Sequence, residues 1–177
     1  MNPACFPVGI LPVGEIDGSL VQSVAGSLSG EFHVPGNILP AVAPFLDAFD
    51  NRRVQYDAGV IIKKLENMDF SGYAKVIALF DEDLFIPVFS FVLGEARMGG
   101  RCALVSLHRL HGDPKRTIKV AMHEFGHLMN LGHCDQKGCV MNFSKDTKHL
   151  DMVSTTFCRV CRQSVLYRIT TLACEGF

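Results

Sequence analysis

His123, Glu124 and His127 stand within the segment HEFGHLMNLGH, which ends at His133. An α-helix has 3.6 residues per turn, so positions i and i+4 lie one above the other on the same face. His123 and His127 can therefore present two imidazoles to one metal ion. Glu124 projects to the side of that pair, where it can reach a metal-bound water without serving as a ligand. The spacing predicts a zinc site with Glu124 as the general base.

A third imidazole can complete this site only if the chain turns back after the helix. His133 follows His127 by six residues and cannot lie on the same straight helix face. Asn130 and Gly132 are the residues between them that best tolerate a positive φ. Three nitrogen ligands leave a fourth tetrahedral position open, as in catalytic zinc sites. A bare HExxH also occurs as two surface histidines beside a solvated glutamate, but the third histidine and a methionine beyond it favour zinc.

Four cysteines follow with the spacing of a second, structural zinc site. They form a C-x4-C pair and a C-x2-C pair, at Cys134, Cys139, Cys158 and Cys161. Disulfides and unligated core thiols are the alternatives. The first residues contain no secretory signal, which favours reduced thiols and a cytoplasmic location. Cys134 directly follows His133, so either residue could serve the first metal, and the three-histidine pattern favours His133.

The remaining three cysteines are scattered along the chain. None has a partner at a metal-binding spacing, and a free cysteine commonly behaves as a small buried apolar residue. We therefore expect burial without a ligand role at Cys5, Cys102 and Cys174.

The helix that must carry the histidines has a predicted start. Asp113 suits the N-cap position, and Pro114 suits the first helical position. An apolar surface follows that would bury the helix, at Ile118, Val120, Ala121, Met122, Phe125, Leu128 and Met129. A buried helix would hold the ligands rigidly.

Three features of the sequence occur together: HEFGHLMNLGH, Met141 in CVMNF, and the CDQKGC and CRVC pairs around that methionine. In these features the chain resembles the archaemetzincin family of metzincin metalloproteases. The resemblance covers about Lys75 to Cys161. It implies that Met141 forms a tight turn beneath the zinc-binding histidines. Two departures stand out: Asn130 occupies a position where the family usually has Gly, and Phe143 stands where some metzincins carry a tyrosine that assists the transition state. Asn tolerates left-handed geometry best after Gly, so the turn before His133 is expected to be kept.

Composition indicates one folded domain over residues 1–177. The chain is 48% hydrophobic and 20% charged, which argues against disorder. No apolar run reaches the roughly 20 residues needed to cross a bilayer, so no membrane partner is expected. A net charge of −1 gives no basis for nucleic-acid binding. The sequence does not indicate the oligomeric state.

The pattern of apolar runs predicts an α/β fold. The resemblance adds a metzincin-like architecture: a twisted mixed sheet of about four to five strands with an antiparallel edge strand, packed on helices that include the zinc-binding helix. Strands are predicted over 5–13, 32–39, 75–80, 89–93 and 103–107, the last two joined around Gly99-Gly100. Helices are predicted over 19–28, 58–68 and 157–169, with 40–49 left as a turn-prone segment. Residues 89–94 are the candidate for an edge strand to which a peptide could add.

These patterns predict a zinc peptidase in which residues 112–177 carry two zinc ions. His123, His127 and His133 would hold the catalytic zinc, whose bound water would lose its proton to Glu124. The substrate would be a peptide or protein, and endopeptidase and aminopeptidase activity are not separated. One alternative is a catalytically weak or inactive module that binds peptides or regulates a partner with the same fold. Another is a four-cysteine nucleic-acid module, which the charge balance disfavours.

Overall fold

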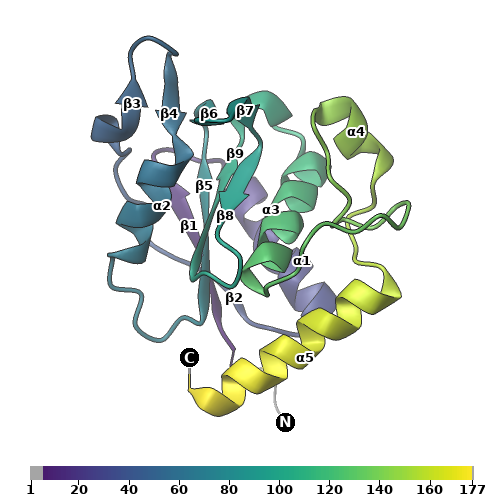
Figure 1. Cartoon of the computed structure of the whole chain (residues 1–177). Coiled ribbons are helices and arrows are strands. Elements are labelled where there is room, and N and C mark those ends of the chain that lie inside the picture. The colour runs from purple at the N-terminus through teal and green to yellow at the C-terminus, as the bar shows by residue number, and fades with distance from the viewer. Residues whose placement is uncertain (1–5, 177) are drawn as a thin grey trace.

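The main sheet has five strands in the order β2-β1-β5-β9-β8, seen in the computed structural model, which describes residues 6–176 (Figure 1). The first four strands run parallel and β8 runs antiparallel to β9. Every residue of β5 and β9 is buried, because helices cover both faces of the sheet. The strands are β1 (Val8–Val13), β2 (Gly36–Ile38), β5 (Lys75–Phe80), β8 (Gly94–Ala96) and β9 (Cys102–Ser106). The predicted α/β fold with an antiparallel edge strand is confirmed.

Helices pack on the two faces of this sheet as one compact domain. Helices α1 (Gly18–Phe32) and α3 (Pro114–Leu128) lie side by side on one face, and α2 (Ala58–Glu66) covers the other (Figure 1). The predicted start of α3 is confirmed, since the Asp113 carboxylate accepts hydrogen bonds from the backbone N–H groups of Lys115 and Arg116, at 2.8 and 3.2 Å. Helix α3 thereby begins at a defined residue and runs buried beneath the site.

Two helices follow α3. The short α4 (Thr147–Met152) has no counterpart in the sequence prediction, whereas α5 (Arg159–Glu175) corresponds to the predicted C-terminal helix and runs beyond its expected end at 169. Arg162 fastens α5 to α1 by donating hydrogen bonds to the carboxylate and the backbone oxygen of Glu31, both at 3.0 Å. Among the described residues, no helix has the length and apolar character to cross a membrane.

A second, four-stranded sheet was not predicted. Its order is β3-β4-β6-β7, from β3 (Phe49–Asp50), β4 (Gln55–Asp57), β6 (Leu84–Ile86) and β7 (Phe89–Val92). Asp83 connects segments of this second sheet, because the Asp83 carboxylate accepts hydrogen bonds from Gln55 and from Arg109. The Arg109 guanidinium also lies 4.0 Å from the centre of the Phe91 ring. The β6–β7 hairpin is thus held firmly beside the main sheet.

The predicted pairing of 89–93 with 103–107 is wrong. Strand β7 pairs with β6, and the residues that pair with β9 are those of β8, which begins five residues after the start of β7. The Gly99-Gly100 turn is confirmed, but it joins β8 to β9, with Gly99 at φ 69°. The antiparallel edge strand of the main sheet is therefore Gly94–Ala96 rather than 89–94.

Other element boundaries differ for local reasons. The strand predicted over 32–39 is reduced to β2, because α1 continues to Phe32 and ends where His33 adopts a left-handed φ of 58°. Strand β1 occupies most of 5–13, although Cys5 lies outside the described residues. The helix predicted over 58–68 is confirmed as α2, and the turn-prone segment 40–49 contains one 3-10 turn, Leu46–Ala48.

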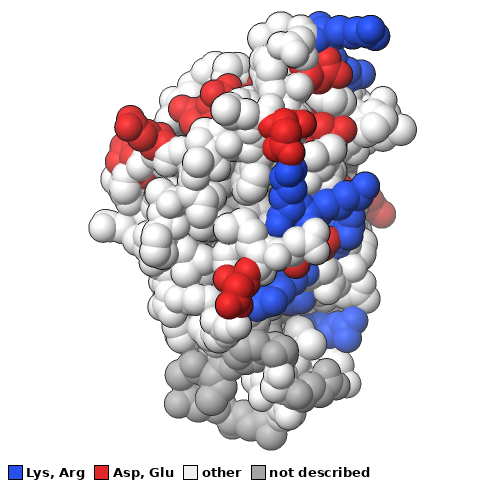
Figure 2. All heavy atoms as spheres, turned by 90° about the vertical axis from the view of Figure 1, so that its left-hand side faces the viewer, with Lys and Arg blue, Asp and Glu red and all other residues white. Residues whose placement is uncertain are grey.

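The face that carries α2 bears basic and acidic side chains close together (Figure 2). Lys64 pairs with Asp47 at 2.5 Å, and Arg97 pairs with Glu66 at 2.6 Å. Intermixed charges of this kind form no broad basic surface on this face.

Candidate active site and metal centres

The end of helix α3 is a turn that carries the chain back over the helix. Asn130 has a left-handed φ of 63°, as predicted, whereas Gly132 does not have a positive φ. The N–H of Asn130 donates to the oxygen of His127 at 2.8 Å, and the N–H of Leu131 donates to that of Gly126 at 3.0 Å. This is the Schellman pattern of helix termination. The predicted turn is confirmed, with Asn130 at its left-handed position.

Backbone oxygens hold two of the three imidazoles in a single tautomer. The Nδ1 atom of His123 lies 2.8 Å from the oxygen of Val140, and that of His127 lies 2.8 Å from the oxygen of Leu131. A carbonyl oxygen only accepts, so each Nδ1 carries the proton and each Nε2 keeps its lone pair. The turn that ends α3 therefore also orients His127.

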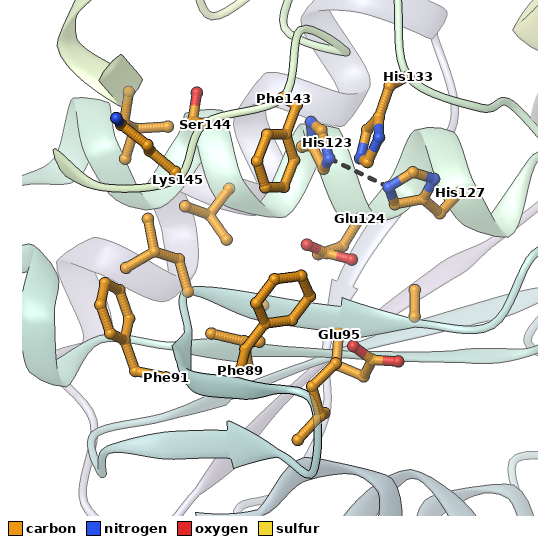
Figure 3. A pocket seen from close by; sticks show the side chains of 17 residues that line it. Phe89, Phe91, Glu95, His123, Glu124, His127, His133, Phe143, Ser144 and Lys145 are labelled. Carbon is orange, nitrogen blue, oxygen red and sulfur yellow. Dashed lines mark hydrogen bonds between the residues drawn. The ribbon is translucent and has the colours of Figure 1, made fainter. Parts of the chain in front are cut away.

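The three imidazoles converge in a way that fits a cation. The Nε2 atoms of His123 and His127 are 3.0 Å apart, so two lone pairs face each other (Figure 3). Tetrahedral zinc would hold two such nitrogens roughly 3.3 Å apart. His133 joins them, and the ring nitrogens of all three lie within 4.8 Å of one another. The structure thus brings the three predicted ligands together, and this donor set fits zinc.

The histidine pKa values suit this role. Burial lowers the pKa of His123 to about 4, and burial also lowers that of His127. Both rings are therefore neutral near pH 7, which is the form that binds metal.

Glu124 lies beneath the imidazoles and packs against the edge strand (Figure 3). A Cβ on Gly94 would lie 2.6 Å from the Glu124 Oε1 atom, so only glycine leaves room for the carboxylate there. Burial raises the pKa of Glu124 well above its usual value, and the charge of Glu95 raises it further. A cation at the histidines would counter both effects and favour the carboxylate.

Met141 lies directly below the histidine-bearing helix. It is fully buried, and a Cβ on Gly126 would lie 2.2 Å from its sulfur. The Met141 oxygen accepts a hydrogen bond from the N–H of Cys134 at 2.9 Å. Gly126 in HEFGH is therefore the residue that lets Met141 approach α3.

The four cysteines form a second cluster. Their sulfurs lie within 4.8 Å of one another, and those of Cys134 and Cys158 are 4.0 Å apart. All four are free thiols, so no disulfide forms among them. Two sulfurs also accept backbone N–H groups, from Gln136 to Cys134 at 3.4 Å and from Cys158 to Cys139 at 3.3 Å. Converging sulfurs that accept N–H donors suit a thiolate-bound zinc.

The other cysteines differ in burial. Cys102 is fully buried and burial raises the pKa of its thiol to about 11, which confirms the predicted small apolar role. Cys174 is exposed on α5, so the prediction of burial is wrong there. Cys5 lies outside the described residues.

A cavity of about 320 Å³ opens over the histidines and Glu124. Strand β8 forms one wall with all three of its residues, and Phe89, Phe91 and Phe143 add aromatic rings (Figure 3). The Phe143 ring centre is 5.1 Å from that of His133, and its side chain offers no hydroxyl. Sequence reasoning missed Glu95 and Lys145 in this lining, because neither stands in a recognisable spacing.

The fold and this site define a zinc metallopeptidase, and the chain belongs to peptidase family M54, whose model matches residues 19–166. That segment contains the three histidines, Glu124 and the four cysteines.

Relatives with similar sequences include archaemetzincins. The chain is 40% identical over 121 residues to the archaemetzincin of Methanopyrus kandleri, covering 66% of this chain and 69% of the relative. It is 31% identical to that of Pyrococcus abyssi, covering 91% and 95%. The crystal structure of the Methanopyrus kandleri archaemetzincin superposes with a TM-score of 0.84 at 32% identity, covering 94% of this chain and 97% of that one.

Proposed function

We propose that this chain hydrolyses peptide bonds with a zinc ion held by His123, His127 and His133 and with Glu124 as the general base. The observation that carries the proposal is the facing pair of Nε2 lone pairs at 3.0 Å, with a buried carboxylate on the next residue of the same helix. A second zinc would be held by Cys134, Cys139, Cys158 and Cys161. Its role would be structural, because four protein ligands leave no open position.

Zinc in the histidine site supplies Lewis-acid activation of a water molecule and of the substrate carbonyl. The protein provides the proton transfers. The Glu124 carboxylate accepts a proton from the attacking water and returns it to the leaving nitrogen when the peptide bond breaks. Val140 and Leu131 keep the imidazoles fixed through their carbonyl oxygens. The free edge of β8 would hold the substrate in an extended conformation by backbone hydrogen bonds.

The direct test is hydrolysis of a peptide library together with zinc analysis on the same sample. We expect two zinc ions per chain and cleavage of short peptides that stops when a chelator removes the histidine-bound zinc. Intact protein with two zinc ions that cleaves no peptide would favour the alternative of a peptide-binding module. Free-terminus and blocked peptides in the same library separate exopeptidase from endopeptidase cleavage.

Gly94→Ala should reduce turnover without removing zinc. The added methyl group would lie 2.6 Å from the Glu124 Oε1 atom, so the carboxylate must move away from its position. A displacement on the order of 1 Å in a catalytic group can cost about a hundredfold in rate. We expect kcat to fall by about ten- to a hundredfold, with the zinc content unchanged.

Gly30→Ala on α1 is the matched control, since a Cβ there meets nothing within 4 Å. It should retain wild-type kcat. Equal kcat values for the wild type and Gly94→Ala would show that the position of Glu124 does not depend on Gly94.

A further inference from the structure

The cavity over the histidines carries one charged side chain near each end. Glu95 lies at the end near His127, and Lys145 lies at the opposite end, past the Phe143 ring (Figure 3). The lining between these two ends holds the histidines and Glu124 together with the rings of Phe89 and Phe143 (Figure 3). The cavity therefore has a negative end and a positive end, one on either side of the histidine site.

Neither charge is paired within the described part of the chain. Arg97, two residues beyond Glu95, is paired with Glu66 at 2.6 Å. Asp146, next to Lys145, is instead hydrogen-bonded to His149 at 2.9 Å. Arg109, whose guanidinium lies over the Phe91 ring, is paired with Asp83. Glu124 also lines the cavity but belongs to the catalytic group, so Glu95 and Lys145 are the charges that remain available to a ligand.

Glu95 is the more buried of the two charged side chains. Side chains alternate along a strand, so Glu95 is directed away from the face on which Gly94 meets Glu124. Ile86 and Val92 line the cavity on that side of the strand. Burial raises the pKa of Glu95, an effect that the charge of Arg97 opposes. A ligand cation would stabilise a half-buried carboxylate in these apolar surroundings.

The direction of the edge strand gives the two charges an order along a bound peptide. The chain approaches β8 from Phe91, at the end where Lys145 lies, and runs toward Glu95 and Ala96 (Figure 3). A peptide added antiparallel to β8 would place its N-terminal part by Glu95 and its C-terminal part by Lys145. A peptide carries a positive charge at its N-terminus and a negative charge at its C-terminus. Antiparallel addition therefore matches the charges of the cavity, and parallel addition opposes them.

We propose that this site selects short peptides by charge at two positions: a cationic group N-terminal to the cleaved bond binds Glu95, and a carboxylate C-terminal to it binds Lys145. This inference rests on the proposed peptidase function and adds the class of peptide that the site selects. The cation can be an α-amino group or a Lys or Arg side chain, and the carboxylate a C-terminus or an acidic side chain.

The test uses one peptide core in four forms: neutral, cationic on the N-terminal side, acidic on the C-terminal side, and with both charges reversed. An exposed ion pair contributes little and a half-buried one contributes more, so we expect kcat/KM to rise about tenfold with the cation and about threefold with the acid. The peptide with reversed charges should have a lower kcat/KM than the neutral peptide, and 1 M salt should reduce these ratios of kcat/KM.

Variants assign each preference to its residue. Glu95→Gln should bring the cation ratio close to one, and Lys145→Gln should do the same for the acid ratio. Glu15→Gln and Lys148→Gln, at exposed positions outside the cavity lining, should keep the wild-type ratios. Acetylating the N-terminus or amidating the C-terminus identifies whether terminal or side-chain charges are bound.

Binding separates this proposal from the proposed function. Dissociation constants of the same peptides are measured on zinc-loaded Glu124→Gln, where turnover is not needed. Charge ratios that appear in Kd support the proposal even if the wild type cleaves nothing. Equal Kd values for the neutral and reversed peptides, or ratios that survive in Glu95→Gln and Lys145→Gln, would overturn it.

Discussion

Glu124→Gln should retain both zinc ions and lose peptide hydrolysis. Gln keeps the size of the side chain beside Gly94 but cannot accept the proton of the attacking water. General base catalysis contributes about 10²- to 10⁴-fold, and we expect kcat to fall within or beyond that range. Glu124 is not a predicted ligand, so the histidine zinc should stay. Metal analysis and kcat on one preparation measure both quantities.

Two further variants sharpen this test. Glu124→Ala leaves a gap against Gly94 and should be equally inactive, which separates the missing carboxylate from any effect of shape. Glu15→Gln changes an exposed carboxylate and should have wild-type kcat and zinc content. Undiminished turnover by Glu124→Gln would exclude Glu124 as the base. Loss of one zinc together with activity would instead indicate that Glu124 helps to hold the metal.

The parts of the site that the sequence predicted are those set by local geometry. His123, Glu124 and His127 lie within a little over one helical turn, so their relation follows from the helix period alone. The turn at Asn130 is also local, because few residue types accept a left-handed φ. The cysteine cluster was predictable for a different reason: four cysteines in a C-x4-C and a C-x2-C pair have the spacing of a zinc site.

The parts of the fold and the site that the sequence did not predict depend on contacts between distant segments. Strand pairing is not encoded in a single run of apolar residues, so 89–93 was paired with the wrong partner and the strand that pairs with β9 was predicted to begin five residues too early. The sequence around Gly94 and Gly126 indicates no structural role for either glycine. Their roles appear only when Glu124 and Met141 are seen packed against their α-carbons. Glycines at close approaches are therefore part of this site, although no spacing rule finds them.

Cys158→Ser combined with Cys161→Ser should reduce the zinc content from two ions to one and weaken the remaining site. Both cysteines lie at the start of α5, whose attachment to α1 through Arg162 and Glu31 does not involve the cluster. The helix should therefore stay in place while the metal is lost. In zinc-finger peptides, structural zinc contributes about 10 kcal/mol or more of apparent folding free energy, so a marked fall in Tm is expected.

The effect should reach the histidines through the backbone. Cys134 adjoins His133 and donates its N–H to the oxygen of Met141, and Cys139 precedes Val140, whose oxygen orients the His123 ring. Groups that orient ligands in this way typically change metal affinity by about 10- to 100-fold. We expect a weakening in that range, measured by chelator competition. Cys174→Ser, at an exposed cysteine of the same helix, should keep two zinc ions. Unchanged affinity at the histidines after loss of the cysteine zinc would show that the two sites are independent.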